Sequence, residues 1–154
     1  MKKILIALDY NPSAQKIAET GYALAKSMDA EVVLLHVMEE INYYSGYDYS
    51  PIMGFDNFSN VNALLPGTME DLKKGVVEFL NKSKEHLGGA NIETLVKDGE
   101  PASTIIETAT EIHADVIVIG SHSRRGLEKI LMGSVAEKVL HHSKIPLFII
   151  PSKE

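Results

Sequence analysis

Two glycines that flank a polar, basic segment are the residues of this sequence best placed to bind a ligand. Gly120 follows Val116–Ile119, an apolar run rich in β-branched residues, and Gly133 and Ser134 open a later helical segment. Glycine allows a tight turn and lets a ligand approach the backbone closely. The first N–H groups of a helix and the positive end of its dipole suit an anion. The segment therefore predicts a cradle for phosphate.

Asp9 is the second residue that points to chemistry. It closes Ile4–Leu8, a short apolar run that we expect to be the first strand. Ligands of open parallel α/β sheets bind at the carboxyl ends of strands, which is where Asp9 lies. A carboxylate at the end of a buried strand is costly without a partner. A ribose hydroxyl, a metal-bound water or the amides of Asn11 and Ser13 would each serve.

The glycine segment resembles the nucleotide-binding signature of the universal stress protein family. That signature is glycine, two residues, glycine, nine residues, then glycine followed by serine or threonine. The sequence has Gly120, then Ser123 in place of the middle glycine, then Gly133 and Ser134 at the matching spacing. The resemblance extends from Met1–Asp9 to Ile145–Pro151, nearly the whole chain.

The resemblance implies a site for an adenine nucleotide: ATP, or ADP or AMP, together with Mg. It places the sugar and the adenine edge against Asp9 and Val37, and the sugar and phosphates against the glycine signature. The nucleotide-binding residues that we expect are Ala7, Leu8, Asp9, Val37, Ile119, Gly120, His122, Ser123, Gly133, Ser134, Val135 and Ala136.

Two of these positions have competing interpretations. Ser134 and Glu137 also form a capping box, in which the Ser134 hydroxyl would bind the amide of Glu137 rather than a phosphate. We favour phosphate contact through the amides of Ser134, Val135 and Ala136. Serine at position 123 discourages a positive φ and crowds a phosphate, yet its hydroxyl could itself donate to a phosphate oxygen.

For the histidines and the other basic residues, a solvent-exposed position on the surface is an alternative to a functional role. His122 is either a ligand contact or a simple loop histidine. The adjacent pair His141–His142 looks like a metal site, but neighbouring helical positions do not face each other, so favourable charge at a helix C-terminus explains it better. The residues that either neutralise phosphates or form a solvated run are Arg124, Arg125 and Lys129.

Alternating strands and helices must position these residues. The expected strands are Ile4–Leu8, Glu31–Val37, Ile92–Val96, Val116–Ile119 and Leu147–Ile150; the expected helices span 12–28, 68–87, the segment after the Asp98–Pro101 turn, and 134–142. This order predicts an α/β fold with an open parallel sheet, right-handed crossovers and helices on both faces. The resemblance supplies five strands in the order 3-2-1-4-5, a Rossmann-like fold similar to the adenine nucleotide alpha hydrolases. Asp9 and Gly120 then meet at the switch point.

The chain is expected to form a single domain over residues 1–154, with a long loop insertion at about 39–67. That insertion is rich in tyrosine and has no sustained helical or strand period. It is interpreted either as a lid that offers stacking surfaces or as a variable surface insertion.

Composition excludes several function classes. The formal charge of −6 argues against nucleic-acid binding, and the absence of cysteine excludes thiol chemistry and fits a reducing compartment. No window reaches the length of a membrane span, so we expect no membrane partner and a cytoplasmic location. Neither a P-loop nor a nucleophile elbow occurs. No general base or nucleophile stands beside the expected phosphates, which favours a protein that is not an enzyme; slow hydrolysis of ATP is left open.

Two functions therefore compete. The first, which we favour, is an ATP-binding regulatory module of the stress response, whose occupancy changes the shape seen by an unknown protein partner. The alternative is a nucleotide-free interaction or scaffold protein of the same fold. We also expect a homodimer through Leu147–Ile150, because an apolar edge strand invites association and Pro146 and Pro151 limit it to a short stretch. The resemblance implies the same interface.

Overall fold

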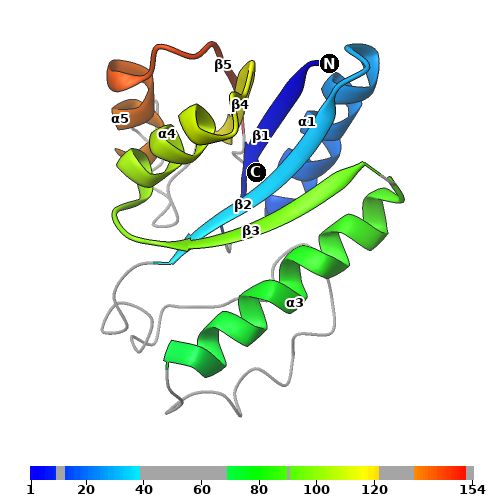
Figure 1. Cartoon of the computed structure of the whole chain (residues 1–154), viewed down its shortest axis with the longest axis vertical. Coiled ribbons are helices and arrows are strands. Elements are labelled where there is room, and N and C mark those ends of the chain that lie inside the picture. Colours follow the sequence, from blue (N-terminus) through cyan, green and yellow to red (C-terminus); the bar gives the residue numbers. More distant parts are fainter. Residues whose placement is uncertain (10–12, 39–68, 90, 122–133, 152–154) are drawn as a thin grey trace.

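The computed structural model describes residues 1–9, 13–38, 69–89, 91–121 and 134–151. Five parallel strands form one sheet in the order β3-β2-β1-β4-β5 (Figure 1). The strands are β1 Lys3–Ala7, β2 Glu31–Met38, β3 Ile92–Asp98, β4 Val116–Gly120 and β5 Leu147–Ile150. The helices are α1 Ala14–Ser27, α3 Met69–Leu87, α4 Pro101–Glu111 and α5 Ser134–His142. The predicted fold class and strand order are confirmed.

The central strands are apolar because both faces of the sheet are covered. Ile4, Leu5 and Ile6 of β1 are all fully buried, although their side chains point alternately to opposite faces. Such continuous apolar runs are typical of parallel strands that helices cover on both sides.

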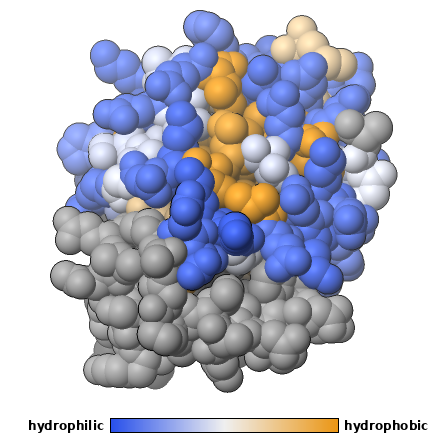
Figure 2. All heavy atoms as spheres, turned by 60° about the horizontal axis from the view of Figure 1, so that its bottom comes forward, coloured by the Kyte–Doolittle hydropathy of each residue, from blue (hydrophilic) through white to orange (hydrophobic). Residues whose placement is uncertain are grey.

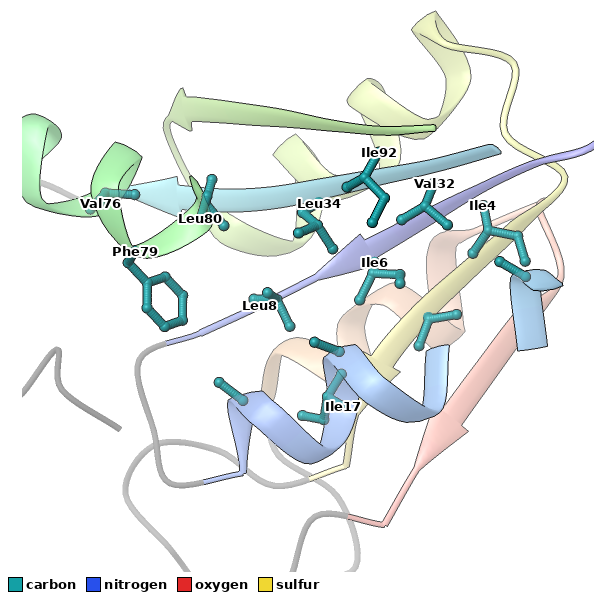
Figure 3. Close-up of a cluster of buried hydrophobic side chains, with 14 of the residues drawn as sticks. Ile4, Ile6, Leu8, Ile17, Val32, Leu34, Val76, Phe79, Leu80 and Ile92 are labelled. Atoms are coloured by element: carbon teal, nitrogen blue, oxygen red, sulfur yellow. The ribbon is translucent and has the colours of Figure 1, made fainter. Parts of the chain in front are cut away.

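One face of the sheet packs against α1 and α3. Their cluster joins Ile6 from β1 and Leu8 just after it, Leu34 from β2, Ile17 from α1 and Phe79 from α3 (Figure 3). The opposite face packs against α4 and α5, with Leu5, Val33, Ile105 and Val139 among its buried residues. Figure 1 shows α4 and α5 together on one side of the sheet and α1 on the other.

Several element boundaries differ from the sequence prediction. β1 ends at Ala7 rather than Leu8, whereas β2 and β3 run on to Met38 and Asp98 because these two residues pair with each other. α1 begins at Ala14 and has Ser13 at its N-cap, so the start expected at 12 was too early. The loop expected at about 39–67, and residues 12 and 68, where two of the helices were expected to begin, lie outside the described residues.

The surface of the described residues is mixed in polarity. Among the described residues in the view of Figure 2, most of the surface is hydrophilic, with a band of apolar residues between the hydrophilic ones. The large hydrophobic side chains that are exposed are Met1, Val77, Leu140 and Phe148. In the part of the chain that the structure describes, no helix combines the length and the apolar character that crossing a membrane requires.

Candidate functional site

The candidate site lies where the carboxyl ends of β1 and β4 meet. Ile4, Leu5 and Ile6 pair with Val116, Ile117 and Val118, so the two strands run side by side in the same direction. The chain leaves β1 for α1 on one face of the sheet, and it leaves β4 for α5 on the other. This divergence is the switch point at which open α/β sheets bind ligands.

β1 brings three of the predicted residues to this edge. Ala7 packs against the cluster beneath α4 and α5, whereas Leu8 is buried in the cluster beneath α1 and α3. Asp9 follows them and is partly buried. Because the side chain of Leu8 is buried in the core, it does not face a ligand.

Five predicted residues from four elements gather around one hydrophobic cluster. They share the face of the sheet that α4 and α5 cover, where Ile119 and Ala136 are buried and the other three are partly buried. These residues are Ala7, Val37, Ile119, Val135 and Ala136. The fold therefore unites positions that are far apart in the sequence, and they offer an apolar wall and backbone groups rather than charged side chains.

The end of β4 is tied to β5 by its backbone. Gly120 pairs with Ile150, and the amide of Ser121 donates to the carbonyl of Ile150 at 2.9 Å. This hydrogen bond holds the chain in register just before the predicted phosphate segment. The segment from 122 to 133 lies outside the described residues. The roles of the predicted residues within it therefore stay predictions; these are His122, Ser123, Arg124, Arg125, Lys129 and Gly133.

α5 begins at Ser134, and Glu137 lies in its first turn. The Oε2 of Glu137 is 3.9 Å from Nε2 of His141, one turn later. The side chain of Ser134 lies outside what the structure describes, so both the capping box and the phosphate contact stay predictions. The first amides of α5 have the general capacity of a helix N-terminus to bind an anion.

The helical histidine pair does not act as a unit. His142 lies with its Nδ1 2.9 Å from the carbonyl oxygen of Lys138, so Nδ1 carries the proton and donates. His141 faces Glu137 instead. Among the residues that the structure describes, no cluster of three or more histidine, cysteine or acidic side chains could hold a metal ion.

Glu100 shapes the electrostatics of α4, the helix that follows β3. Its carboxylate accepts from the amides of Ser103 at 2.9 Å and Ala102 at 3.3 Å. The hydrogen bond from the Ser103 amide lowers the pKa of Glu100 most, and Lys138 of α5 adds a smaller attraction. The Glu100 side chain thereby satisfies the N-terminus of α4.

His36 is a residue that the sequence reasoning missed. It is 1% exposed and lies in β2, in which the residues from Val32 to Met38 are otherwise apolar. Its Nδ1 lies 2.9 Å from the carbonyl oxygen of Leu8. The signal was present in the sequence, because a histidine within Val32–Met38 interrupts a continuous apolar run.

Comparison with known proteins shows to which family the chain belongs. A sequence profile of the universal stress protein family matches residues 1–151. The chain belongs to the universal stress protein family. It is 34% identical to a universal stress protein of Methanocaldococcus jannaschii, with 99% of this chain and 85% of that protein covered. It is 31% identical to the Bacillus subtilis universal stress protein YxiE, with 96% and 97% covered.

Solved structures of the family share the fold. The structure of MJ0577, a universal stress protein of Methanocaldococcus jannaschii, superposes with a TM-score of 0.76 at 25% identity, over 99% of this chain and 97% of that one. A universal stress protein crystallised with cAMP gives 0.63 at 21% identity, over 98% and 97%. An Archaeoglobus fulgidus family member in complex with dAMP gives 0.59 at 20%, over 97% and 98%.

Proposed function

We propose that this protein is a regulatory module that binds an adenine nucleotide, with Mg-ATP as the principal ligand, at the carboxyl ends of β1 and β4. The observation that carries the proposal is the pairing of these two strands, since it brings Asp9 and Gly120 to one edge of the sheet at the switch point. Two solved relatives of the same fold are complexes with cAMP and dAMP, which supports an adenine nucleotide as the ligand class.

Each part of a nucleotide has a suitable partner at this edge. The apolar wall that includes Val37 and Ile119 suits a base, and the carboxylate of Asp9 suits the hydroxyls of a ribose. The first turn of α5 suits phosphates, because its backbone N–H groups point along the helix axis away from the helix body. These partners give the binding orientation that we propose.

Magnesium would arrive with the phosphates rather than occupy a site of its own. Mg²⁺ usually keeps several waters and is held by one or two carboxylates together with substrate phosphates. The described residues contain no cluster of three metal-ligating side chains, and Asp9 is the carboxylate at the proposed edge. This edge thus fits a nucleotide-borne Mg²⁺. Asp9 would then contact the metal, directly or through water, in place of the ribose hydroxyls.

We further propose that the module signals by shape rather than by catalysis. In the stress response that the family name denotes, nucleotide occupancy would alter the surface that a protein partner meets. Association through β5 would present this surface twice in a homodimer. Phe148 on that strand is 37% exposed, so part of its ring would be available for contact with a second copy.

Mass spectrometry of the nucleotide released from purified, denatured protein tests this function directly, and titration calorimetry with Mg-ATP measures the affinity. We expect one molecule of adenine nucleotide per chain and a binding heat that saturates. The absence of any heat or thermal shift at millimolar Mg-ATP, with AMP and ADP equally silent, would favour the nucleotide-free interaction protein. Turnover of ATP during the titration would show catalysis and contradict the non-enzymatic part of the proposal.

A further inference from the structure

The imidazole of His36 holds the end of β1 in place. Its Nδ1 lies 2.9 Å from the carbonyl oxygen of Leu8, and the histidine is 1% exposed. A carbonyl oxygen can only accept a hydrogen bond, so Nδ1 must carry the proton and donate it. A neutral imidazole can make this hydrogen bond, and the bond then fixes the tautomer of His36 as the one with its proton on Nδ1.

This hydrogen bond continues the connection between β1 and β2 beyond the strand ladder. The paired register of the two strands ends at Ala7 and Leu35. The amide of Leu8 still donates to the carbonyl of Leu35 at 2.8 Å, and the carbonyl of Leu8 then accepts from the His36 side chain. Both backbone polar groups of Leu8 are therefore bound to β2.

Anchoring the Leu8 carbonyl also orients Asp9. The carbonyl of Leu8 and the amide of Asp9 belong to one planar peptide group. Fixing the carbonyl oxygen of Leu8 therefore also fixes the orientation of the backbone N–H of Asp9. The side chain of Leu8 is buried against the cluster that contains Leu34 and Phe79, which removes the remaining freedom of that residue (Figure 3).

Packing alone does not explain a histidine at this position. By strand alternation, His36 points to the same face as Leu34 and Met38, which are both fully buried. An aliphatic side chain would fill the same core without the cost of burying a polar ring. The imidazole supplies a hydrogen-bond donor for the carbonyl oxygen of Leu8, which an aliphatic residue cannot do.

We infer that His36 is a positioning residue for nucleotide binding: by holding the Leu8 carbonyl, it presents Asp9 to the ribose and phosphate side of the ligand. This inference rests on the proposed function, since it concerns the affinity of the same site. His36 does not contact the ligand in this scheme. It acts through the Leu8–Asp9 peptide.

Two substitutions separate the hydrogen bond from the packing. His36→Leu fills the core but lacks a donor, whereas His36→Asn is smaller but places an amide N–H close to where Nδ1 stood. Val32→Ala is the matched control, because Val32 is a buried residue on the same face of β2, away from the carboxyl edge. Each variant is titrated with Mg-ATP by calorimetry and unfolded with urea.

We expect His36→Leu to bind Mg-ATP about tenfold more weakly than the wild type, a change of about 1.4 kcal/mol. His36→Asn should bind within about threefold of the wild type even though it loses stability, and Val32→Ala should lose stability with unchanged affinity. In the nucleotide-free protein, hydrogen exchange in a peptide that spans residues 4–9 should be faster in His36→Leu than in Val32→Ala.

Two results overturn the inference, and they differ from a failure of the proposed function. Wild-type affinity in His36→Leu shows that the Leu8 anchor does not serve binding. Equal losses in His36→Leu and His36→Asn show that shape rather than the donor matters. If the wild type itself binds no nucleotide, the proposed function fails and the inference fails with it, and the exchange experiment then reports only whether His36 anchors β1.

Discussion

Ile6 of β1 pairs with Val118 of β4, and this is the last pair in the ladder that the two strands share. Beyond it both chains run in the same direction, one toward Asp9 and the other toward Gly120. A single register therefore determines which carboxylate and which glycine reach the same edge. A shift of one residue in this pairing would move every side chain of the shifted strand to the opposite face of the sheet.

Removing the Asp9 carboxylate should weaken nucleotide binding selectively. Asp9→Ala is expected to reduce the affinity for Mg-ATP at least tenfold, or about 1.4 kcal/mol, which is within the range of one charged hydrogen bond. The control is Asp115→Ala: Asp115 lies at the opposite edge of the sheet, where its Oδ2 accepts from the Lys3 amide at 2.8 Å. That variant should lose some stability and keep its affinity in calorimetry. Equal effects of the two variants would contradict the placement of the ligand.

The phosphate end of the site is tested at Gly133, which the family signature places there. Gly133→Val should also reduce the affinity for Mg-ATP at least tenfold, because a branched side chain would obstruct approach to the start of α5. Thermal unfolding measured beside the calorimetry shows whether the loss is confined to binding. Unchanged affinity would place the phosphates elsewhere.

Substitutions at Ser123 decide how this chain accommodates the missing glycine of the signature. If serine crowds the phosphate, Ser123→Gly should tighten the binding of Mg-ATP. If its hydroxyl contacts the phosphate, Ser123→Ala should weaken binding and Ser123→Gly should not improve it. Calorimetry on both variants distinguishes these cases, and unchanged affinity in both would place Ser123 outside the site.

Gly99 should be among the least replaceable glycines for stability. Its φ of +145° is rare for residues with a side chain, and an added Cβ would lie 2.7 Å from the hydroxyl oxygen of Thr104. We expect Gly99→Ala to lower the free energy of unfolding by about 2 kcal/mol in urea titrations. Gly88→Ala is the control, because Gly88 has a φ of +72° but open space around the added Cβ, and about 1 kcal/mol is expected. A larger loss at Gly88 would refute this ranking.

Much of the fold could be predicted from patterns that are local in sequence. The continuous apolar runs that became β1 and β4 identify buried parallel strands without any knowledge of their partners. The length of β3 could not be predicted in this way, because Lys97 and Asp98 are polar and join the strand only through pairing with Val37 and Met38. Strand order was likewise not available from periodicity and came from the family resemblance.

Less of the candidate site than of the fold could be predicted from the sequence. Positions such as Val37 and Ile119 could be named from the resemblance, but their convergence on one cluster depends on the whole sheet. The capping box at Ser134 is a local prediction about a side chain outside what the structure describes, so it stays a prediction beside the phosphate contact. His36 was overlooked because a buried histidine has meaning only once its partner, the Leu8 carbonyl, is known.

The pH dependence of stability should include a contribution from Glu100. The amide of Ser103, with a smaller effect from Lys138, holds the pKa of this carboxyl below its ordinary value of 4.5. A lowered folded-state pKa stabilises the protein above the unfolded-state pKa, and this stabilisation is lost as pH falls through the folded-state value. Glu100→Gln should therefore cost about 0.5 kcal/mol at pH 7, a small amount because the side chain is about half exposed, and progressively less below pH 4.5. Urea unfolding of both proteins at several pH values measures this difference. A gap that widens in acid would contradict the assignment.

Association through β5 should depend on Phe148. Among the described residues the strand is the edge of the sheet next to β4, and an edge strand can pair with a second copy. A two-fold axis beside it would pair the strand antiparallel with itself. Ile150 is unsuitable for the test, because it is 3% exposed and a charge there would disrupt the core. Phe148→Glu should instead convert a dimer to a monomer in light scattering at micromolar concentration. Val77→Glu is the matched control, because Val77 lies on α3 with 38% exposure against 37% for Phe148, and it should leave the dimer intact. A wild-type mass of one chain, or a dimer that survives Phe148→Glu, would show that β5 is not the interface.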